Sequence, residues 1–356
     1  MSGVAPGWVR AVDHAERTIA RLEALGISVI GTGEDLLSKR AVFTNAPRDR
    51  RRSMGDHCRL MPTRDGWCAV HLPRPDDRDL LPAWLGIEAT SDAIPWETIA
   101  SAVADRSGID LVDVGQELGL AVSIPPIGED AQLRDRNTVN PARPWIRRRV
   151  GAPGDRSSLD GALVVDLSSL WAGPLCARVL SGAGARVVKV ESTTRPDGGR
   201  EGDRAFFEWL HEGQEYVSLP LAEPSGVDEL LRLLDRADVI IEGSRPRALD
   251  RMGITPAEVV GRRSGVVWTS ITAYGRCGPW SDRVGFGDDT AIAGGLLDLD
   301  EDGAPCFVDD AVADPLTGLV AAALTADAVG RGGGVTIDVA LREVARSAAQ
   351  SAMVVW

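Results

Sequence analysis

Histidine is scarce in this chain of 356 residues, which has four, at His14, His57, His71 and His211. So few histidines form no HExxH motif and no Ser/His/Asp spacing, which speaks against a zinc protease or a serine hydrolase. The five cysteines include no CxxC pair. We therefore expect reduced structural thiols, with no metal site and no disulfide framework.

A surplus of positive charge is missing as well, and so are long apolar runs. The formal net charge of -13 argues against partners such as nucleic acid or an anionic membrane. No apolar run reaches the ~20 residues that a membrane span requires, and the opening MSGVAPGWVRAVD lacks the apolar core of a signal peptide. We expect a cytoplasmic protein that holds any phosphate-bearing ligand with local arginines or backbone N–H groups.

The remaining composition, 44% hydrophobic and 26% charged, is typical of a globular protein with a core. Apolar residues recur at helical spacing from 8 to 25, and Gly26 is a suitable end for that helix. Residues 1–54 are therefore predicted to form an N-terminal helix and a linker.

A small α+β domain is predicted for residues 55–126. Two short apolar segments flank Arg64-Asp65-Gly66, and Asp-Gly is a strong signal for a hairpin turn. Helical patterns follow near 80–85, 96–106 and 111–118. Residues 127–160 are rich in Pro, Arg and Asp, and we expect an extended connector with little regular structure.

Strand and helix alternate from residue 161 to the end of the chain. "ALVVDLS", "RVVKVES", "ADVIIEG" and "GVVWTSIT" have the continuous apolar pattern of buried strands, and helical segments separate them. This alternation predicts βαβ units and a large α/β domain with a parallel sheet. Gly182-Ala183-Gly184 follows the first helix instead of preceding it, so we interpret it as a helix end and turn and not as a dinucleotide site.

The loop after the first strand, 168–174, lies where open α/β sheets bind ligands. Arginines follow the next two motifs in the same position, with Arg195, Arg200 and Arg204 after "KVES" and Arg245, Arg247 and Arg251 after "ADVIIEG". They are either solvated surface charges or contacts for a phosphate-bearing ligand.

Asp314 stands directly before a proline and an alanine-rich helix, in "AVADPLTGLVAAALTADAV". Asp is a preferred N-cap and Pro a preferred first helical residue, so capping is one interpretation. A carboxylate at a helix N-terminus is also expected to stay ionised at neutral pH, and an ionised carboxylate can attack an activated acyl carbon.

Five segments taken together resemble the family III CoA-transferases, the group that includes formyl-CoA transferase, carnitine dehydratase and 2-methylacyl-CoA racemase. They follow one another in the family's order over about residues 160–345. The segments are "VVDLSSLWAGPLCARVLSGAGARVVKVES", "ADVIIEGSRPRALDRMGI", "VVWTSITAYGRCGPWSDRVGFGDDTAIAGG", "DPLTGLVAAALTADAV" and "GGGVTIDVAL".

The resemblance implies a Rossmann-like large domain over 161–356 that binds coenzyme A, and an interlocked homodimer. It implies that the enzyme transfers coenzyme A from an acyl-CoA to a small carboxylic acid, both bound as substrates, with no permanently bound cofactor. Asp314 falls on the nucleophile that forms the covalent intermediate. The positions implied to contact coenzyme A are Leu170, Trp171, Ala248, Arg251 and Met252, to which we add Arg195 as a compensating charge.

The chain departs from the family pattern where the coenzyme is held. Gly243-Ser244 replaces the usual Asn-Phe pair, Gln214 and Glu215 replace two basic residues, and Ser192 replaces an Arg of one branch. These losses leave open a non-catalytic acyl-CoA-binding homologue. A racemase or isomerase is a third alternative, although Phe286 stands where that branch has its histidine and cannot move a proton.

The segments before residue 127 also resemble this family, but in a different order. "CRLMPTRDGWCAVHL" and "LGLAVSIPPI" resemble its small domain and return segment, which usually follow the nucleophile domain. We therefore expect a circularly permuted order, in which the connector 127–160 lies against the large domain and the chain end near Trp356 approaches the N-terminal helix.

Overall fold

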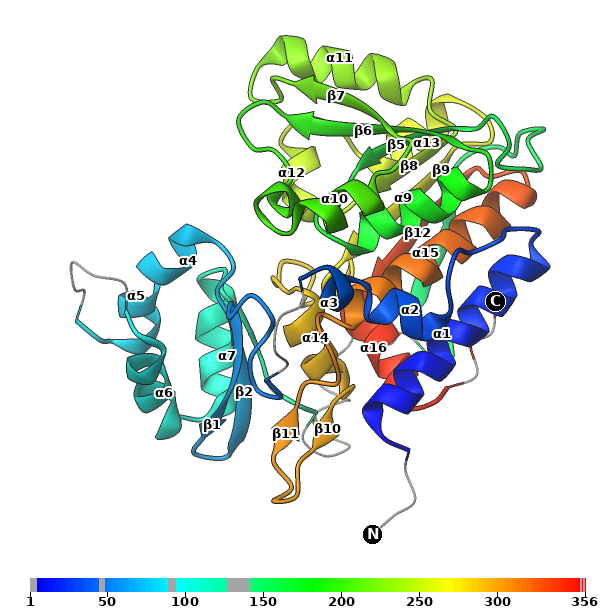
Figure 1. Cartoon of the computed structure of the whole chain (residues 1–356). Helices are drawn as coiled ribbons and strands as arrows, with labels where there is room; N and C mark the ends of the chain where they lie inside the picture. The colour runs from blue at the N-terminus through cyan, green and yellow to red at the C-terminus, as the bar shows by residue number, and fades with distance from the viewer. Residues whose placement is uncertain are drawn as a thin grey trace.

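The structure is a computed structural model that describes residues 5–44, 49–88, 94–126, 140, 142–352, 354 and 356. A large α/β part and a smaller α+β part lie side by side (Figure 1). No helix in the described ranges is both long enough and apolar enough to cross a membrane.

The large part is built on one sheet of seven strands, in the order β4-β12-β9-β8-β5-β6-β7. All neighbours pair in parallel except β4, which pairs antiparallel with β12 at one edge. Numbered along the chain, the six parallel strands have the order 3-2-1-4-5-6, which is the doubly wound order of Rossmann folds. The strands are β4 (Trp145–Arg149), β5 (Leu163–Leu167), β6 (Arg186–Ser192), β7 (Glu215–Leu219), β8 (Val239–Glu242), β9 (Val267–Thr272) and β12 (Val335–Ala340).

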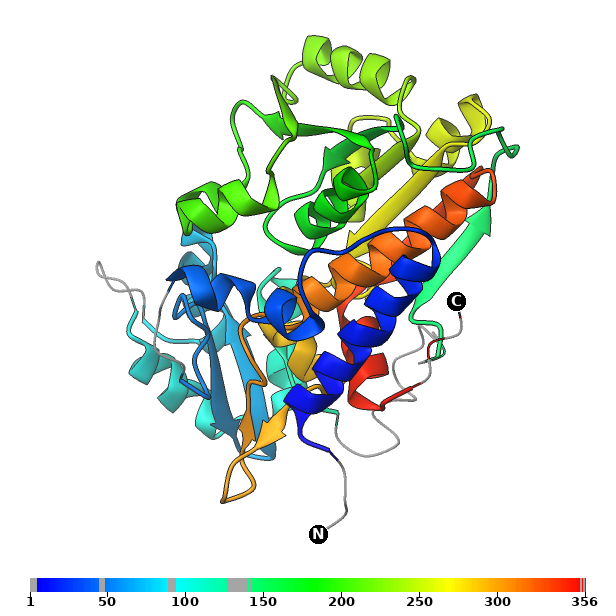
Figure 2. The same cartoon turned by 45° about the vertical axis from the view of Figure 1, so that its right-hand side comes forward.

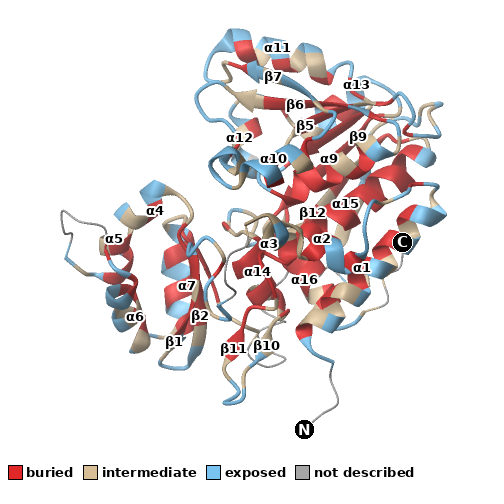
Figure 3. Ribbon diagram, viewed as in Figure 1, coloured by how far each residue is buried: buried red, intermediate tan, exposed pale blue. Residues whose placement is uncertain are grey.

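Helices cover both faces of this sheet, because its inner strands are apolar on both sides (Figure 3). One face carries α9 (Ala172–Gly182) and the almost wholly buried α15 (Ala313–Gly330), and the core between them is continuous. The other face carries α11 (Pro224–Leu234), α12 (Pro246–Asp250) and α13 (Pro256–Arg262) over a second core.

The N-terminal helix belongs to the large part and not to the small one. Helix α1 (Gly7–Ala24) lays an apolar stripe of Ala11, Ala15, Ile19 and Leu22 on the core of α15, and Figure 2 shows the two helices side by side. The final helix α16 (Leu341–Ala349) also meets α1, since Arg10 Nη1 donates a hydrogen bond to the carbonyl of Ala349. Two short helices, α2 (Gly33–Leu37) and α3 (Lys39–Thr44), follow α1.

The small part confirms the predicted hairpin. Strands β1 (Cys58–Thr63) and β2 (Gly66–His71) pair antiparallel around the Arg64-Asp65 turn, and β3 (Ala121–Ser123) joins β2. One face of this sheet packs on its own core of helices. These helices are α4 (Pro75–Asp79), α5 (Leu81–Leu85), α6 (Trp96–Ala104) and α7 (Gly108–Glu117).

The other face of the small sheet packs against α14 (Gly287–Gly294), a helix of the second half of the chain. Cys58, Leu60 and Ala69 form one apolar cluster with Ile292 and Phe307. The Oγ of Ser123 donates a 2.7 Å hydrogen bond to the carbonyl of Asp289. A short hairpin of β10 (Asp298–Leu299) and β11 (Pro305–Cys306) follows α14. The small sheet is thus sandwiched between its own helices and α14.

The connector differs from the prediction, because it contributes a strand. Strand β4 forms from "WIRRR" and pairs with β12 along its whole length. The residues of β4 are half-buried or exposed. The sequence therefore has no clear alternation of apolar and polar residues there that would predict a strand. Residues 127–139 and 141 of the connector lie outside the described residues. At the chain end, the ring of Trp356 stacks on Trp145 with 5.4 Å between centroids.

Close packing of α9 on α15 requires glycine at position 318. A Cβ added at Gly318 would lie 2.6 Å from the carbonyl oxygen of Ala172 and 3.1 Å from Leu175 Cβ. We expect Gly318→Ala to lower the free energy of unfolding by about 1–3 kcal/mol through overpacking, as measured by urea denaturation.

The matched control is Gly261→Ala in α13, where an added Cβ meets nothing within 4 Å. Because alanine is a better helix former than glycine by about 1 kcal/mol, this change is expected to leave stability unchanged or raise it. Equal losses in both variants would contradict the packing argument.

Candidate active site

Asp314 lies in the first turn of α15 and does not cap it, so the capping interpretation is wrong. The helix begins at Ala313 with Val312 at the N-cap position, and no side chain makes a cap hydrogen bond. The backbone N–H of Asp314 donates to Ala311 O at 2.8 Å in a tight turn, where Ala311 has a positive φ of 44°. This turn starts the helix one residue before Asp314, which leaves the Asp314 carboxylate without a capping role.

The start of α14 approaches the Asp314 carboxylate very closely. A Cβ added at Gly287 would lie 2.6 Å from Asp314 Oδ2 and 2.5 Å from the carbonyl oxygen of Ala311. Next to it, Asp288 Oδ1 accepts a 2.8 Å hydrogen bond from the backbone N–H of Ala311. Asp314 itself is partly exposed, so its carboxylate is held between two helix starts and is still reachable.

One arginine balances the carboxylates in this region. Arg40 of α3 makes a two-pronged ion pair with the buried Asp310. Its guanidinium also lies over the ring of Trp171, 5.3 Å from the centroid, and its charge acts on Asp314 and Asp288. A residue of the N-terminal segment thus supplies the cation of a site formed mainly by the second half of the chain.

Burial raises the pKa of Asp314 to about 7 and that of Asp288 to about 6. The charge of Arg40 opposes the shift at Asp314, while the neighbouring carboxylates of Asp288 and Asp310 add to it. The sequence-based expectation of an ionised carboxylate is therefore wrong in its electrostatics. At neutral pH Asp314 is divided between its protonated and ionised forms, because desolvation and like charges outweigh the helix N-terminus.

His71 joins this region, and the sequence analysis did not single it out. Its Nδ1 lies 2.9 Å from Oδ1 of the fully buried Asp289, and its ring packs on Phe286 with 4.9 Å between centroids. Burial lowers the pKa of His71, but Asp289 and the carboxylates of Asp288 and Asp314 outweigh this effect, so the pKa is raised overall. The scarcity of histidine was the one sequence signal that pointed to His71, since the chain has only four histidines.

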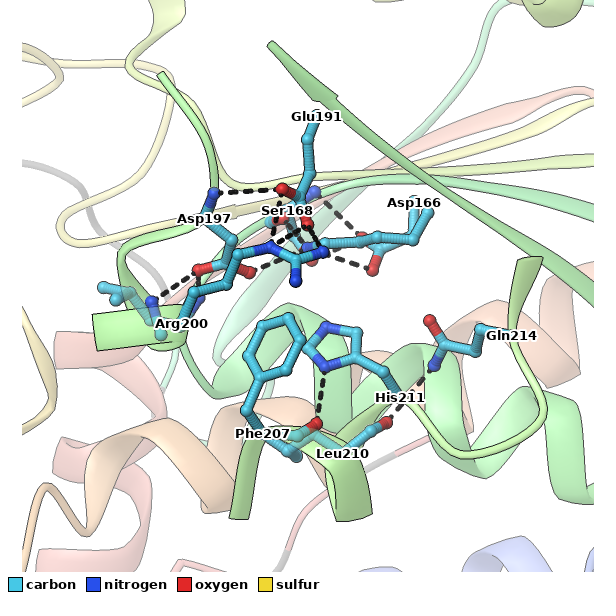
Figure 4. Close-up of polar contacts among 12 residues, drawn as sticks. Asp166, Ser168, Glu191, Asp197, Arg200, Phe207, Leu210, His211 and Gln214 are labelled. Carbon is cyan, nitrogen blue, oxygen red and sulfur yellow. Dashed lines mark hydrogen bonds and ion pairs between the residues drawn. The ribbon is translucent and has the colours of Figure 1, made fainter. Parts of the chain in front are cut away.

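The loop after β5 is held by a buried charge cluster (Figure 4). Lys189 of β6 lies between Asp166 and Asp197, at 3.7 and 2.9 Å, and all three are buried. Lys189 also donates to the carbonyl of Ser168, and Asp197 Oδ1 accepts from the backbone N–H of Leu170 at 2.9 Å. These bonds fix Leu170 in the left-handed region, with φ of 70°, and leave its side chain exposed.

Trp171, which was predicted beside Leu170 as a coenzyme contact, is only 1% exposed. It packs edge-on against Phe206, with 5.0 Å between centroids, and beneath Arg40. In this structure Trp171 therefore supports the loop from below, while Leu170 is presented to solvent.

The remaining predicted coenzyme contacts lie at the carboxyl ends of β6 and β8. Ala248 is in α12, and Arg251 and Met252 follow it directly. Arg195 is exposed in the turn after β6 and has no ion pair among the described residues. Arg200 is occupied, because it pairs with Glu191 at 2.8 Å and lies over Phe207.

Arg245 extends from the end of β8 toward the small part. A Cβ added at Gly119 would lie 3.8 Å from Arg245 Nη1, and Arg74 donates a 2.7 Å hydrogen bond to the carbonyl of the same residue. Burial lowers the pKa of Arg245, and the like charges of Arg74 and Arg195 lower it further. Three arginines from three elements therefore converge near the sheet's carboxyl edge.

The positions that depart from the family pattern make local bonds. Ser244 donates to Glu242 at 2.7 Å, Ser192 Oγ lies 3.2 Å from Thr194 Oγ1, and Gln214 donates to Leu210 O at 3.2 Å. A Cβ added at Gly243 would lie 3.5 Å from Ser168 Cβ, so the loops after β5 and β8 are adjacent. No group of three or more His, Cys, Asp or Glu residues in the described ranges is placed to hold a metal ion.

A doubly wound sheet with a carboxylate between two helix starts defines an α/β enzyme-like site at the sheet's carboxyl edge. Residues 159–356 match the profile of CoA-transferase family III, and the chain belongs to that family. The segment before residue 159 lies outside this match.

The similar proteins include two named transferases. A probable fatty acyl-CoA transferase of Mycobacterium tuberculosis is 32% identical over 160 residues, which are 42% of this chain and 36% of that protein. The (R)-2-hydroxy-4-methylpentanoate CoA-transferase of Clostridioides difficile is 33% identical over 138 residues, 36% of this chain and 35% of the relative. The chain thus matches little more than a third of the length of each.

A solved structure of a hypothetical protein from Mycobacterium tuberculosis is also similar. It aligns with a TM-score of 0.50 and 27% identity, and the alignment covers 55% of this chain and 59% of the other. Family membership and the mixed α/β fold with a mainly parallel sheet are therefore established.

The raised pKa of Asp314 predicts a pH-dependent stability cost. An unfolded Asp has a pKa near 3.9, so the native protein binds this proton more tightly than the unfolded chain does. Its contribution to stability is present below about pH 3.9 and is lost as pH rises through about 7. Asn at position 314 cannot ionise. The free energy of unfolding of Asp314→Asn relative to the wild type should therefore be higher at pH 8 than at pH 5, by on the order of 2 kcal/mol.

Urea denaturation of both proteins at the two pH values measures this difference. Asp282→Asn, at an exposed carboxylate paired with Arg247, is the control and should show no comparable change between pH 5 and pH 8. A stability difference for Asp314→Asn that does not vary with pH would contradict the raised pKa.

Proposed function

We propose that this protein is an acyl-CoA:carboxylate CoA-transferase that works through a covalent intermediate on Asp314. The observation that carries the proposal is the Asp314 carboxylate itself: it is uncapped, partly exposed and pressed against Gly287 at the ligand-binding edge of the sheet. The transferase names of the relatives from Clostridioides difficile and Mycobacterium tuberculosis support the same reaction class.

In the proposed reaction an ionised Asp314 oxygen attacks the thioester carbon of the acyl-CoA. This step forms a mixed anhydride and releases the thiolate of coenzyme A. The thiolate attacks Asp314 Cγ, releases the first acid as a carboxylate and leaves coenzyme A as an aspartyl thioester. The acceptor carboxylate then takes up the coenzyme by the same two steps in reverse. Arg40 favours the ionised form that the first attack requires.

Coenzyme A is proposed to lie across the loops after β5, β6 and β8. Leu170 offers an exposed apolar contact, Trp171 supports the loop beneath it, and Ala248, Arg251 and Met252 flank the adenine and phosphate end. Arg195, with Arg245 and Arg74 beside it, supplies the positive charge that is missing at Ser192 and Gln214. The coenzyme is a substrate in this proposal, and no permanently bound cofactor is required.

We propose four parts along the chain. They are an N-terminal helix and linker (1–54), a small domain (55–126), a connector (127–160) and a large domain (161–356). The pairing of β4 with β12 and the contact of α16 with α1 support a permuted order in which the connector returns to the large domain. From the resemblance to the family we also propose that the protein is cytoplasmic and forms a homodimer.

An acyl-CoA isomerase or racemase is a second candidate, because His71 supplies next to Phe286 an imidazole that position 286 lacks. Deuterium wash-in at the carbon next to the thioester, without any acceptor acid, would favour it. A non-catalytic acyl-CoA-binding homologue would instead bind coenzyme A equally well after Asp314→Ala and form no adduct.

The covalent mechanism predicts an enzyme adduct. When a panel of acyl-CoA donors is mixed with the protein, intact mass spectrometry should detect an acyl or coenzyme A species that hydroxylamine removes. The adduct should map to Asp314 and be absent from Asp314→Asn, while Asp310→Asn, at the buried partner of Arg40, should still form it. An adduct that persists in Asp314→Asn would refute the assignment of the nucleophile.

The proposed phosphate contacts predict a selective loss of affinity. Arg195→Ala and Arg245→Ala should each weaken coenzyme A binding by roughly ten- to a hundredfold, because a charge-assisted hydrogen bond contributes about 1.5–3 kcal/mol. Arg204→Ala is the matched control, since Arg204 is exposed and pairs with Glu208 in its own helix. Isothermal titration with coenzyme A measures the effect, and equal affinities in all three variants would contradict it.

A further inference from the structure

The transfer reaction described above leaves one titratable group beside Asp314 without a task, the imidazole of His71. It comes from the end of β2 in the small part and is 7% exposed. Only its Nδ1 has a hydrogen-bond partner among the described residues, Asp289 Oδ1 at 2.9 Å. Nε2 is therefore the nitrogen that is free to exchange a proton.

Asp289 is in turn held rigidly, so the orientation of the imidazole is fixed. Asp289 is fully buried, and its Oδ1 also accepts a 2.8 Å hydrogen bond from the backbone N–H of Phe286. The backbone carbonyl of Asp289 accepts a hydrogen bond from the Ser123 hydroxyl. A buried carboxylate at one ring nitrogen fixes the tautomer and leaves the other nitrogen for chemistry.

The dyad lies one residue away from the contact that positions Asp314. The ring of His71 packs on Phe286, and the next residue, Gly287, abuts Asp314 Oδ2. The charged groups that act on His71 are Asp288 and Asp289 from α14 and Asp314 from α15, and His57 from the segment before β1 interacts with it in turn. Three carboxylates around one imidazole favour its protonated form, which suits a proton donor better than a base.

We propose that His71 and Asp289 form an acid–base dyad that delivers a proton to the departing sulfur of coenzyme A and recovers it in the following step. The proposal rests on the aspartyl mechanism proposed above. It assigns a catalytic role to the small part of the chain, for which the resemblance to the family named no residue.

The proton and the electrons balance over two steps. As Asp314 attacks the thioester carbon, the C–S bond breaks toward sulfur and His71 Nε2–H protonates that sulfur, which leaves an anhydride, a thiol and a neutral imidazole. The thiol then attacks Asp314 Cγ while Nε2 takes the proton back, and the first acid leaves as a carboxylate. The dyad ends the half-reaction in the form in which it began.

A purely structural role, in which the His71–Asp289 bond only docks the small sheet on α14, makes a different prediction. The two roles separate when the leaving group is varied, because an S-aryl thiolate is a weaker base and departs without a proton. The ratio of two rates within one variant also does not depend on how much of the preparation is folded.

The experiment measures the rate of adduct formation from one acyl group carried either on coenzyme A or on an S-aryl thiol. In His71→Gln the coenzyme A rate should fall about 100-fold or more, in the range for a lost general acid, while the S-aryl rate should change by only a few-fold. Asp289→Asn should show the same pattern more weakly. His57→Gln, at the exposed histidine before β1, is the control and should keep the wild-type ratio.

A parallel loss of both rates in His71→Gln, or no loss, overturns the dyad while the aspartyl mechanism stands. The absence of any hydroxylamine-sensitive adduct on wild-type Asp314 overturns the aspartyl mechanism and the dyad with it. Deuterium wash-in next to the thioester that is lost in His71→Gln would likewise overturn the proposal, because it would make His71 the base of an isomerase.

Discussion

The contact between Gly287 and Asp314 determines the arrangement of the whole site. Only a hydrogen atom fits at position 287, because a Cβ there would collide with both the Asp314 carboxylate and the carbonyl of Ala311. The absence of a side chain lets the starts of α14 and α15 meet, and this brings Asp288 and Asp289 close to Asp314. Helix α14 in turn presents the surface on which the small sheet packs.

The charges at this junction are balanced by residues from far away in the sequence. Four carboxylates, those of Asp288, Asp289, Asp310 and Asp314, gather at the two helix starts, and burying so many acidic groups is costly unless cations lie near them. Arg40 and His71 supply the opposing charge, and both come from the segment that precedes the large sheet. The balance is incomplete at Asp314, whose pKa is raised to about 7.

The sequence predicted those features that depend on local pattern. Buried-type apolar runs located the parallel strands, Asp65-Gly66 located the hairpin, and the order of five motifs indicated the family. Features set by tertiary packing could not be found in this way. His71 ends a strand with no unusual pattern, and its meeting with Asp289 spans 218 positions. Asp314 was misjudged for the same reason, since its N-terminal position was visible but its desolvation was not.

The order of the segments along the chain matters less than the surfaces they bury. The family match begins at residue 159, yet the cation at Asp310 and the imidazole at Asp289 both lie before residue 72. Helix α1 packs on the core of the large part, and strand β4 joins its sheet. Residues 1–150 therefore do not form a separate body. A fused, unrelated domain would have no reason to place Arg40 against Asp310 and His71 against Phe286. Both residues pair with carboxylates close to Asp314, and this is the strongest structural reason to treat the early segments as part of the same site.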